Sequence, residues 1–595
     1  MDINTFIDTY LAKIQKPAHY LGGEYGSVVK READLRFAFC FPDTYDIGMS
    51  HLGMKILYHM MNDMEDIACE RVFTPDIDME TAMREHGVPL YSLETKTPVK
   101  DFDFAGFTLQ YELSYSNILN MLDLAGIPFL STDRGNDYPV VICGGPCACN
   151  PAPLADFVDI FFIGEGEEFY APLFELYLKH KGNKYKFLEA AAELECMYVP
   201  AFHDGAKKIK RAIIQDIDNV YYPRSFVVPS AEIVHDRVML EIMRGCIRGC
   251  RFCQAGMIYR PYRQKSPKTL IRQAVELCKN TGYDEISLTS LSTSDFERLS
   301  ELTDGLLEYC IPQHINLSLP SLRVDNFTKE ILDKTQSVRK SGLTFAPEAG
   351  TQRLRDVINK NVTDDDIMNT CRIAFENGTS AVKLYFMIGL PTETDEDIAG
   401  IAKTAERILH LFSTIPQTKG KGLQITISLA TFVPKPFTPF QWEPQISLEE
   451  IERKQKYLLS LIKTRKIKVK YHDGTKSVLE GVFARGDRRL GKALLLAWRN
   501  GCKLDGWDNH FKFDVWMDAI REAGLSVEEY AGRRRDFNET LPWDIIDIGI
   551  TKAFLKRECE KAYEAKTTPN CKDQCSGCGV NRLCRGDVCS AYQVR

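Results

Sequence analysis

Strong positive charge is absent from this chain of 595 residues, which has a net charge of −7 and an isoelectric point near 6.0. No global field draws such a chain to nucleic acid, so nucleic acid is not indicated as a partner. No apolar run reaches the ~18 residues of a membrane span, and residues 1–16 lack the apolar core of a signal peptide. Long repeats and low-complexity segments are also absent. These absences exclude membrane and fibrous classes and leave a globular protein without a membrane partner.

Cysteine, by contrast, is abundant, with 19 residues in the chain. Disulfide frameworks are typical of short secreted chains. Here the cysteines gather in a few segments of a long chain without a signal peptide, so we expect a cytoplasmic protein whose thiolates bind metal. The composition, 44% hydrophobic and 26% charged, is that of an ordinary globular protein. The length predicts about three or four domains.

Three regularly spaced cysteines follow the apolar run at 238–243. Cys246, Cys250 and Cys253 form a Cys-x-x-x-Cys-x-x-Cys motif. Soft thiolates suit iron or zinc better than calcium or magnesium. Three thiolates are one short of the four that close an iron–sulfur cube or a structural zinc site, so one metal position stays open. Gly245 and Gly249 let the backbone fold tightly around the metal.

This segment resembles the cluster loop of the radical SAM superfamily. In that superfamily, three cysteines hold a [4Fe-4S] cluster whose open iron binds the amino and carboxyl groups of S-adenosylmethionine. An aromatic residue commonly precedes the third cysteine, as Phe252 does here. The resemblance implies a cluster at Cys246, Cys250 and Cys253, with Phe252 beside the S-adenosylmethionine.

Strand and helix patterns alternate through the N-terminal third. Strands are predicted at 35–43, 67–73, 103–109, 139–144 and 158–164, and helices at 48–64, 113–125 and 166–180. Such alternation predicts a parallel, doubly wound, Rossmann-like sheet over residues 1–200. Ligands of such sheets bind at the carboxyl ends of the strands, where this chain has turn-rich and glycine-rich loops.

The region resembles the cobalamin-binding domain that often precedes a radical SAM core. The GGP turn and the GEGEE strand end carry the resemblance, which implies cobalamin contacts at Asp43, Gly48, Gly144, Gly145, Pro146, Gly164, Glu165 and Gly166. The Asp-x-His-x-x-Gly motif that supplies an axial histidine is missing, because Met49 stands at the place of the Asp. We therefore expect His51 to be a helix or loop residue rather than a cobalt ligand. Nearby Cys143, Cys147 and Cys149 are expected to be small buried residues rather than a metal site.

Six further strand–helix units are predicted after a linker at 201–232. The strands are expected at 238–243, 284–290, 315–322, 341–349, 381–390 and 423–433, and the helices at 267–280, 294–310, 325–335, 363–377 and 394–412. Ser294–Asp295 and Thr363–Asp365 are the expected helix caps. Six units are fewer than the eight of a closed barrel, so we predict a partial (β/α)6 barrel over residues 233–440. This count agrees with the barrel of radical SAM enzymes.

Polar residues and glycines stand at the carboxyl ends of the predicted barrel strands, where active groups of such barrels gather. By resemblance in position, the end of the second strand faces the methionyl amino group of S-adenosylmethionine. The ends of the third to fifth strands face its ribose, carboxylate and adenine. The residues concerned are Ser290, Ser292, Ser318, Ser321, Arg323, Glu348 and Gly389. The turns near residues 347–360 and 389–397 also look like those of methylthiotransferase-type radical SAM proteins.

The last part of the chain is predicted to be helix-rich over residues 441–566. Its basic stretch at 463–474 alternates like an edge strand with lysines facing water. The tail at 567–595 repeats the cysteine spacing and holds more cysteines than one open site needs: Cys571, Cys575, Cys578, Cys584 and Cys589. We expect them to close a metal shell, and the choice between an auxiliary iron–sulfur cluster and zinc stays open.

The order of these segments, including FARGDRRLG at 483–491 and the CSGCGV tail, resembles an uncharacterised bacterial family of cobalamin-binding radical SAM proteins. A small domain of unknown function is sometimes fused to or encoded beside such proteins. The resemblance implies reductive cleavage of S-adenosylmethionine to a 5′-deoxyadenosyl radical and cobalamin-borne methyl transfer to an unactivated carbon. Flavodoxin or ferredoxin is the expected electron donor. The alternatives are a methylthiotransferase-like RNA-modifying enzyme and a cobalamin or redox sensor without catalysis.

Overall fold

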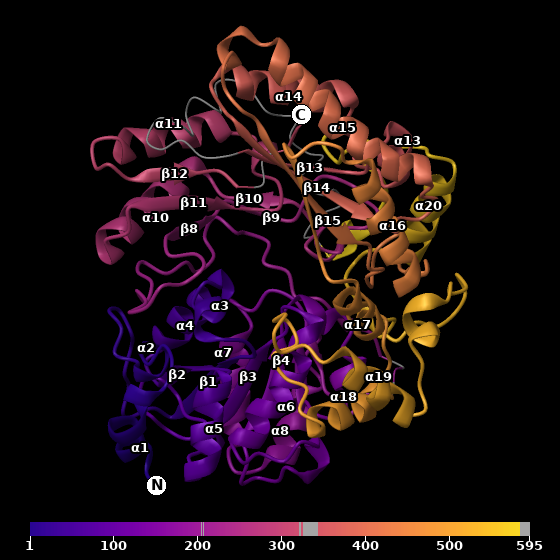
Figure 1. The fold of residues 1–595 in the computed structure, drawn as a ribbon. Helices are drawn as coiled ribbons and strands as arrows, with labels where there is room; N and C mark the ends of the chain where they lie inside the picture. Colours follow the sequence, from indigo (N-terminus) through magenta and orange to yellow (C-terminus); the bar gives the residue numbers. More distant parts are fainter. Residues whose placement is uncertain (204, 206, 321–322, 325–342, 584–595) are drawn as a thin grey trace.

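The computed structural model describes residues 1–203, 205, 207–320, 323–324 and 343–583. Figure 1 shows two α/β halves, with the N-terminal half below and the barrel above. The predicted helix at 325–335 lies outside the described residues, as do Ser321, Cys584 and Cys589. None of the described helices is long and apolar enough to cross a membrane.

The N-terminal half is the predicted doubly wound sheet. Its strand order is β2-β1-β3-β4-β5-β6, and every neighbouring pair is parallel except β5 with β6. The strands are β1 (Leu35–Phe41), β2 (Ile67–Phe73), β3 (Phe104–Thr108), β4 (Val140–Gly144), β5 (Ile160–Phe162) and β6 (Met197–Tyr198). The strand order reverses at β1, between β2 and β3, and such a reversal opens a ligand crevice at the carboxyl ends of the strands.

Helices cover both faces of this sheet, which is why its strands read as nearly continuous apolar runs. They are α1 (Ile3–Tyr10), α2 (Ala18–Leu21), α3 (Tyr45–Gly48), α4 (Leu52–Asn62), α5 (Ile77–His86), α6 (Tyr115–Leu124), α7 (Tyr170–Lys179) and α8 (Lys184–Ala191). The helix predicted at 48–64 is divided into α3 and α4. The backbone of His51 is extended, and its side chain caps α4 by accepting a hydrogen bond from the Met54 N–H.

The barrel half contains two parallel sheets, ordered β12-β11-β8 and β13-β14-β15-β16. The strands are β8 (Val238–Glu241), β11 (Glu285–Thr289), β12 (Asn316–Ser318), β13 (Leu343–Glu348), β14 (Ala381–Ile388), β15 (Gln424–Thr431) and β16 (Ile467–Tyr471). The six predicted strands are all present, and β16 is a seventh. The sheet therefore continues past residue 440, where we expected the barrel to end. Lys468 and Lys470 of β16 face solvent, which confirms the predicted edge strand.

The barrel helices follow their strands as predicted. They are α10 (Pro267–Thr281), α11 (Leu299–Cys310), α13 (Gln352–Val357), α14 (Asp364–Glu376) and α15 (Asp395–Thr414), with the short α9 (Ala255–Ile258) and the hairpin β9 (Met243–Arg244) with β10 (Arg263–Gln264) near the first strand. Thr363 caps α14 in a capping box with Asp366. The cap expected at Ser294–Asp295 is wrong, because these residues form a separate short turn and α11 begins at Leu299.

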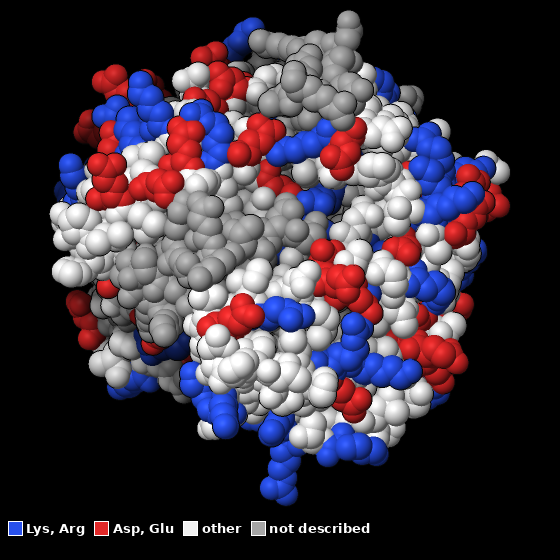
Figure 2. Space-filling view, turned by 90° about the horizontal axis from the view of Figure 1, so that it is seen from above, with Lys and Arg blue, Asp and Glu red and all other residues white. Residues whose placement is uncertain are grey.

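The C-terminal region returns to the N-terminal half. Figure 1 shows α17 (Gly474–Ala484), α18 (Leu490–Arg499) and α19 (Phe513–Glu522) beside it, and α16 (Leu448–Leu461) and α20 (Lys552–Tyr563) beside the barrel. The buried carboxylate of Asp505 joins this region to α6 by accepting hydrogen bonds from Ser116 (2.5 Å) and Trp516 (2.9 Å). The linker is also fixed, because β7 (Ile209–Lys210) pairs with β17 (Ile546–Asp547). Figure 2 shows basic and acidic side chains interspersed on one face.

Candidate functional site

The predicted cluster loop leaves the first barrel strand through a tight turn. Gly245 has a φ of +77°, and a Cβ there would lie 2.5 Å from the carbonyl oxygen of Pro261, so only glycine fits. Backbone N–H groups donate to two of the sulfurs, Arg248 N to Cys246 Sγ (3.4 Å) and Gly256 N to Cys253 Sγ (3.3 Å). All three cysteines are partly exposed. The loop thus presents three thiols with backbone donors that would stabilise thiolates.

Without metal the thiols of Cys246 and Cys253 are neutral at physiological pH. Burial, followed by the neighbouring Cys250, raises the pKa of Cys246 to about 12 and that of Cys253 to about 11. A metal binds the thiolate, so loading a cluster must release these protons. Among the described residues, no three His, Cys, Asp or Glu side chains converge on a single ion position.

A buried polar group braces the cluster loop from the second barrel strand. Arg248 donates to Asp295 (2.8 Å), and Ser292 donates to the same carboxylate (2.7 Å). Ser292 and Asp295 are both buried. Ser292, predicted as a contact to S-adenosylmethionine, therefore holds Asp295 against the loop.

The end of the fourth barrel strand also reaches the cluster loop. Glu348 has a φ of +69°, a conformation that non-glycine residues rarely adopt away from functional sites. Lys360 donates to its carboxylate (3.1 Å), and the charges of both side chains influence the pKa of Cys253. The role of Glu348 toward S-adenosylmethionine stays a prediction.

The other predicted contacts to S-adenosylmethionine are spread over the strand ends. Ser290 lines the main cavity and shares a hydrogen bond with Thr293. Ser318 ends β12, and Arg323 donates through its guanidinium to the carbonyl of Lys360 (2.9 Å). The other two positions are Phe252, which packs partly buried against the core, and Gly389, whose N–H donates to Glu393. These assignments remain predictions.

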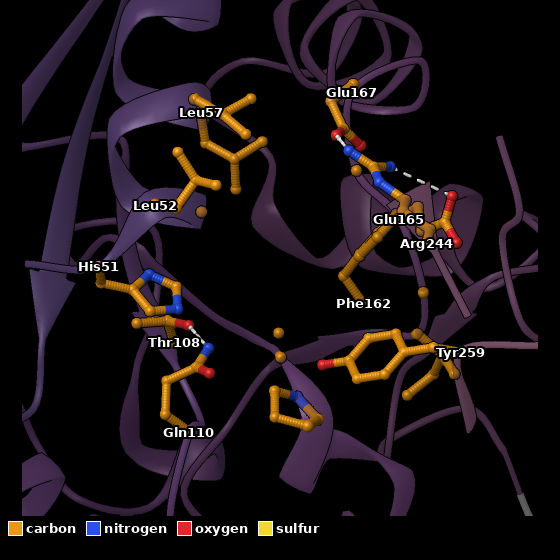
Figure 3. A pocket seen from close by; sticks show the side chains of 18 of the residues that line it. His51, Leu52, Leu57, Thr108, Gln110, Phe162, Glu165, Glu167, Arg244 and Tyr259 are labelled. Carbon is orange, nitrogen blue, oxygen red and sulfur yellow. Dashed lines mark hydrogen bonds and ion pairs between the residues drawn. The ribbon is translucent and has the colours of Figure 1, made fainter. Parts of the chain in front are cut away.

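A cavity of about 440 Å³ lies between the two halves of the molecule. Figure 3 shows His51 and Gln110 on one side of it and Tyr259 and Arg244 on the other. The N-terminal half contributes an apolar part of its lining: Phe37, Phe39, Leu52, Ile56, Leu57, Ile142, Phe162 and Tyr170. The barrel half contributes Glu241, Met243, Arg244, Gly245, Ile258, Tyr259, Thr289, Ser290 and Leu291. One space therefore joins the crevice of the N-terminal sheet to the start of the cluster loop.

Six of the eight predicted cobalamin contacts line this cavity: Gly144, Gly145, Pro146, Gly164, Glu165 and Gly166. A Cβ on Gly144 would meet no atom closer than 3.8 Å, so the missing side chain leaves room that belongs to the cavity. The lining does not include the other two residues, Asp43 and Gly48, and their predicted contacts stay predictions. Asp43 accepts a hydrogen bond from Trp507 (2.9 Å), and Gly48 packs under the ring of Phe73.

His51 lines the cavity but both of its ring nitrogens are engaged. Nδ1 accepts from the Met54 N–H (3.0 Å), so the neutral ring carries its proton on Nε2, which bonds the Gln110 side chain. Gln110 in turn donates to Thr108 (2.6 Å). Burial lowers the pKa of His51 to about 4. The ring thus serves as a helix cap, as expected for a helix or loop residue, and the absence of a bond to cobalt stays a prediction.

A network of charged side chains beside this cavity connects the GEGEE loop (residues 164–168) to the barrel. Glu165 accepts two hydrogen bonds from Arg263 (2.7 and 2.8 Å) and one from Arg244 (3.2 Å). Arg244 also pairs with Glu167 and Glu241, and it directly precedes the cluster loop. Burial raises the pKa of Glu165, but Arg263, then Arg244 and Arg211, lower it to about 2.

The cysteines around the GGP turn are buried, as expected. Burial raises the pKa of Cys149 to about 12, and Cys149 lines the cavity near Tyr259. In the tail, Cys575 is exposed, whereas Cys571 and Cys578 are partly buried.

Two family models match the chain. The model described as "Radical SAM proteins, N-terminal" matches residues 53–200, and the one described as "Radical SAM superfamily" matches residues 240–405. An uncharacterized protein of Methanocaldococcus jannaschii is 30% identical over 463 residues, which cover 77% of this chain and 90% of that relative. The chain belongs to the radical SAM superfamily. This radical SAM enzyme carries the superfamily's motif at Cys246, Cys250 and Cys253.

Two further proteins resemble parts of this radical SAM enzyme. The anaerobic magnesium-protoporphyrin IX monomethyl ester cyclase of Cereibacter sphaeroides is 25% identical over 41% of this chain and 40% of that relative. The radical S-adenosylmethionine methyltransferase TsrM from Kitasatospora setae, solved with cobalamin and a [4Fe-4S] cluster, matches with a TM-score of 0.52 and 12% identity. That match covers 82% of this chain and 99% of TsrM. It confirms the predicted α/β fold, with a Rossmann-like half before a partial barrel.

Sequence reasoning missed several residues of this site. The aromatic rings that line the cavity resemble ordinary core residues in the sequence. Arg244, Arg263 and Tyr259 gave no signal of their own. Only Arg244, next to the cysteine motif, had a position that could have drawn attention to it.

Proposed function

We propose that this radical SAM enzyme transfers a methyl group from cobalamin to an unactivated carbon of its substrate. In this proposal Cys246, Cys250 and Cys253 hold a [4Fe-4S] cluster, S-adenosylmethionine lies at the barrel strand ends, and cobalamin lies in the cavity between the halves. The observation that carries the proposal is that single cavity, which is lined both by glycine-rich loops of the N-terminal sheet and by the residues leading into the cluster loop.

The residues present fit these groups. The loop offers three partly exposed thiols with backbone N–H donors, and the space above Gly144 is open. When bound, the reduced cluster and S-adenosylmethionine supply a 5′-deoxyadenosyl radical, and cobalamin supplies a carrier for methyl groups. The apolar rings of the N-terminal half that line the cavity would exclude water from a flat ligand. Lys360 and Glu348 offer a cation and a carboxylate beside Cys253 for the polar end of S-adenosylmethionine.

His51 is the histidine that lines the proposed cobalamin site. Its Nδ1 is used as a helix cap and its Nε2 holds a proton that bonds Gln110, so the ring offers no free lone pair to cobalt. The proposal therefore requires cobalamin to bind without a histidine ligand from this chain.

The test uses the full chain, reconstituted anaerobically with iron, sulfide and cobalamin, and reduced with dithionite. S-adenosylmethionine with a deuterated methyl group is added, with and without extract of the source cells. We expect 5′-deoxyadenosine to form and the label to appear on cobalamin. Intact cluster that forms no 5′-deoxyadenosine with the extract present would refute the enzyme, and label that never reaches cobalamin would refute methyl transfer through cobalt.

The substrate is sought by profiling the metabolites of a deletion strain for a lost methylated species. A lost methylthio species would support the alternative, a methylthiotransferase-like enzyme, instead. We further propose a cytoplasmic location and a flavodoxin or ferredoxin as electron donor. The free thiols of all described cysteines support a reducing compartment.

A further inference from the structure

The C-terminal tail, from residue 567 on, packs against the cluster loop through its residues Cys571 and Lys572. The N–H of Cys571 donates to the carbonyl of Ile247, a residue inside the cluster motif (3.0 Å). Lys572 donates to the carbonyl of Asp295 (2.9 Å), whose side chain braces the loop through Arg248. The first tail cysteine thus lies one backbone hydrogen bond from the cluster loop.

Asn359 ties the same two segments together from the barrel. Its amide donates to the carbonyl of Gly249 (3.1 Å), and its carbonyl oxygen accepts from the N–H of Thr568 (2.7 Å). Arg251, a buried residue of the cluster loop, donates to the carbonyl of Lys566 (2.7 Å). These contacts hold the tail in one place relative to the cluster loop.

Arg260 lies between the two cysteine motifs. It is 3% exposed, and it donates to the carbonyls of Gly256 (3.0 Å) and Arg248 (2.9 Å). Among the described residues, its buried Nη1 has no hydrogen-bond partner, although leaving such a donor unsatisfied is costly. Burial lowers the pKa of Arg260, but Cys571, Cys578 and Cys246 raise it above its ordinary value. The Arg260 side chain is hydrogen-bonded to Cys578 and interacts electrostatically with Cys571 and Cys246, so it lies between the two motifs with its Nη1 still unsatisfied.

We propose that Cys571, Cys575 and Cys578 hold a second iron–sulfur cluster, which relays electrons to the cluster at Cys246, Cys250 and Cys253. Arg260 Nη1 donates to a sulfur of this second cluster. Cys575 is exposed and the opposite side of the tail contacts the cluster loop, so the second cluster has one face to solvent and one toward the catalytic cluster. The inference rests on the catalytic cluster of the proposed function.

The electron balance of the relay is simple. A low-potential protein donor of the flavodoxin or ferredoxin class gives one electron to the tail cluster and is oxidised by one electron. The tail cluster passes this electron to the catalytic cluster and returns to its oxidised state. No bond forms or breaks, and no proton is transferred.

The first experiment counts metal in the anaerobically reconstituted full chain. The variants are Cys575→Ser, which removes one exposed thiol, Cys250→Ser, which removes a thiol of the catalytic motif, and the matched control Ser576→Ala. We expect about eight iron atoms in the wild-type protein and the control, and about four in each cysteine variant. Cys575→Ser that keeps all its iron, or a wild-type tail that takes up zinc in place of iron under iron-replete conditions, would overturn the second cluster.

The second experiment measures 5′-deoxyadenosine formation with two reductants. Cys575→Ser should keep its rate with dithionite, which reaches the catalytic cluster directly, and lose most of its rate with flavodoxin and its reductase. Equal rates of Cys575→Ser and Ser576→Ala with flavodoxin would overturn the relay. Failure of the proposed function is distinguishable, because a wild-type protein that does not cleave S-adenosylmethionine with dithionite still yields its iron count.

Discussion

Replacing Glu165 with glutamine tests whether the buried charge network fixes the N-terminal half against the barrel. The carboxylate accepts from Arg263 through both oxygens, from Arg244, and from the N–H of Ile214 (3.0 Å). Glutamine keeps one oxygen that can accept, but the amide nitrogen that replaces the other oxygen cannot accept from an arginine. Glu165→Gln therefore removes one of the two hydrogen bonds from Arg263. It also removes the negative charge that compensates the guanidinium groups of Arg263 and Arg244.

The shift in the pKa of Glu165 gives the size of the free energy by which the network stabilises the folded protein. The folded protein lowers it from 4.5 to about 2, which at about 1.4 kcal/mol per pH unit corresponds to about 3 kcal/mol. Removing one partner of a buried ion pair typically costs about 3–5 kcal/mol, so both lines of reasoning agree. Because the folded pKa is the lower one, this stabilisation is complete above pH 4.5 and is lost as the pH falls toward 2.

Hydrogen exchange of the peptide that contains Ile214 is the assay, because it reports the local opening of this network. At pH 7 we expect Glu165→Gln to exchange about 100-fold faster than the wild-type protein, since about 3 kcal/mol is roughly two factors of ten. The matched control is Glu168→Gln, at an exposed position of the same loop. The reasoning is refuted if the two variants exchange alike, or if their difference grows when the pH falls below 4.5.

Two further predictions concern the proposed cofactor sites. Cys250→Ala should lose the catalytic cluster and all 5′-deoxyadenosine formation with dithionite. The control is Cys149→Ala, at a cysteine that lines the cavity outside the motif, and this variant should keep its cluster. A cluster retained in Cys250→Ala would contradict the assignment. His51→Asn, which keeps a capping side chain, should bind cobalamin with an unchanged absorption spectrum from pH 5 to 8, because the histidine is neutral above its pKa of about 4 and does not bind cobalt. A spectral shift in this variant would show that His51 is a cobalt ligand.

Local patterns predicted most of the fold. Strand and helix periods located the five parallel strands of the N-terminal sheet and six of the barrel, because each buries an apolar run that is visible without its neighbours. The seventh barrel strand, β16, was recognised as an edge strand but not assigned to the barrel sheet. Its alternating lysines show which side faces water and say nothing about which strand it pairs with.

The site was predictable where function depends on a local motif. The spacing of Cys246, Cys250 and Cys253 and the glycines at 144–145 and 164–166 are readable from a few adjacent residues. The network around Glu165 was not, because its partner Arg263 is 98 positions away and either residue alone reads as a surface charge. The contact between Asp43 and Trp507 was not predictable for the same reason, since Trp507 comes from a distant part of the chain.

The central claim is that the cavity between the two halves binds cobalamin. It is tested most directly by the cobalamin content of the purified full chain and of Gly144→Val, whose new side chain would project into open cavity space. We predict about one cobalamin per wild-type chain and little in Gly144→Val, with the same iron content in both. A folded, cluster-bearing wild-type protein that binds no cobalamin, or a variant that binds it equally well, would contradict the account.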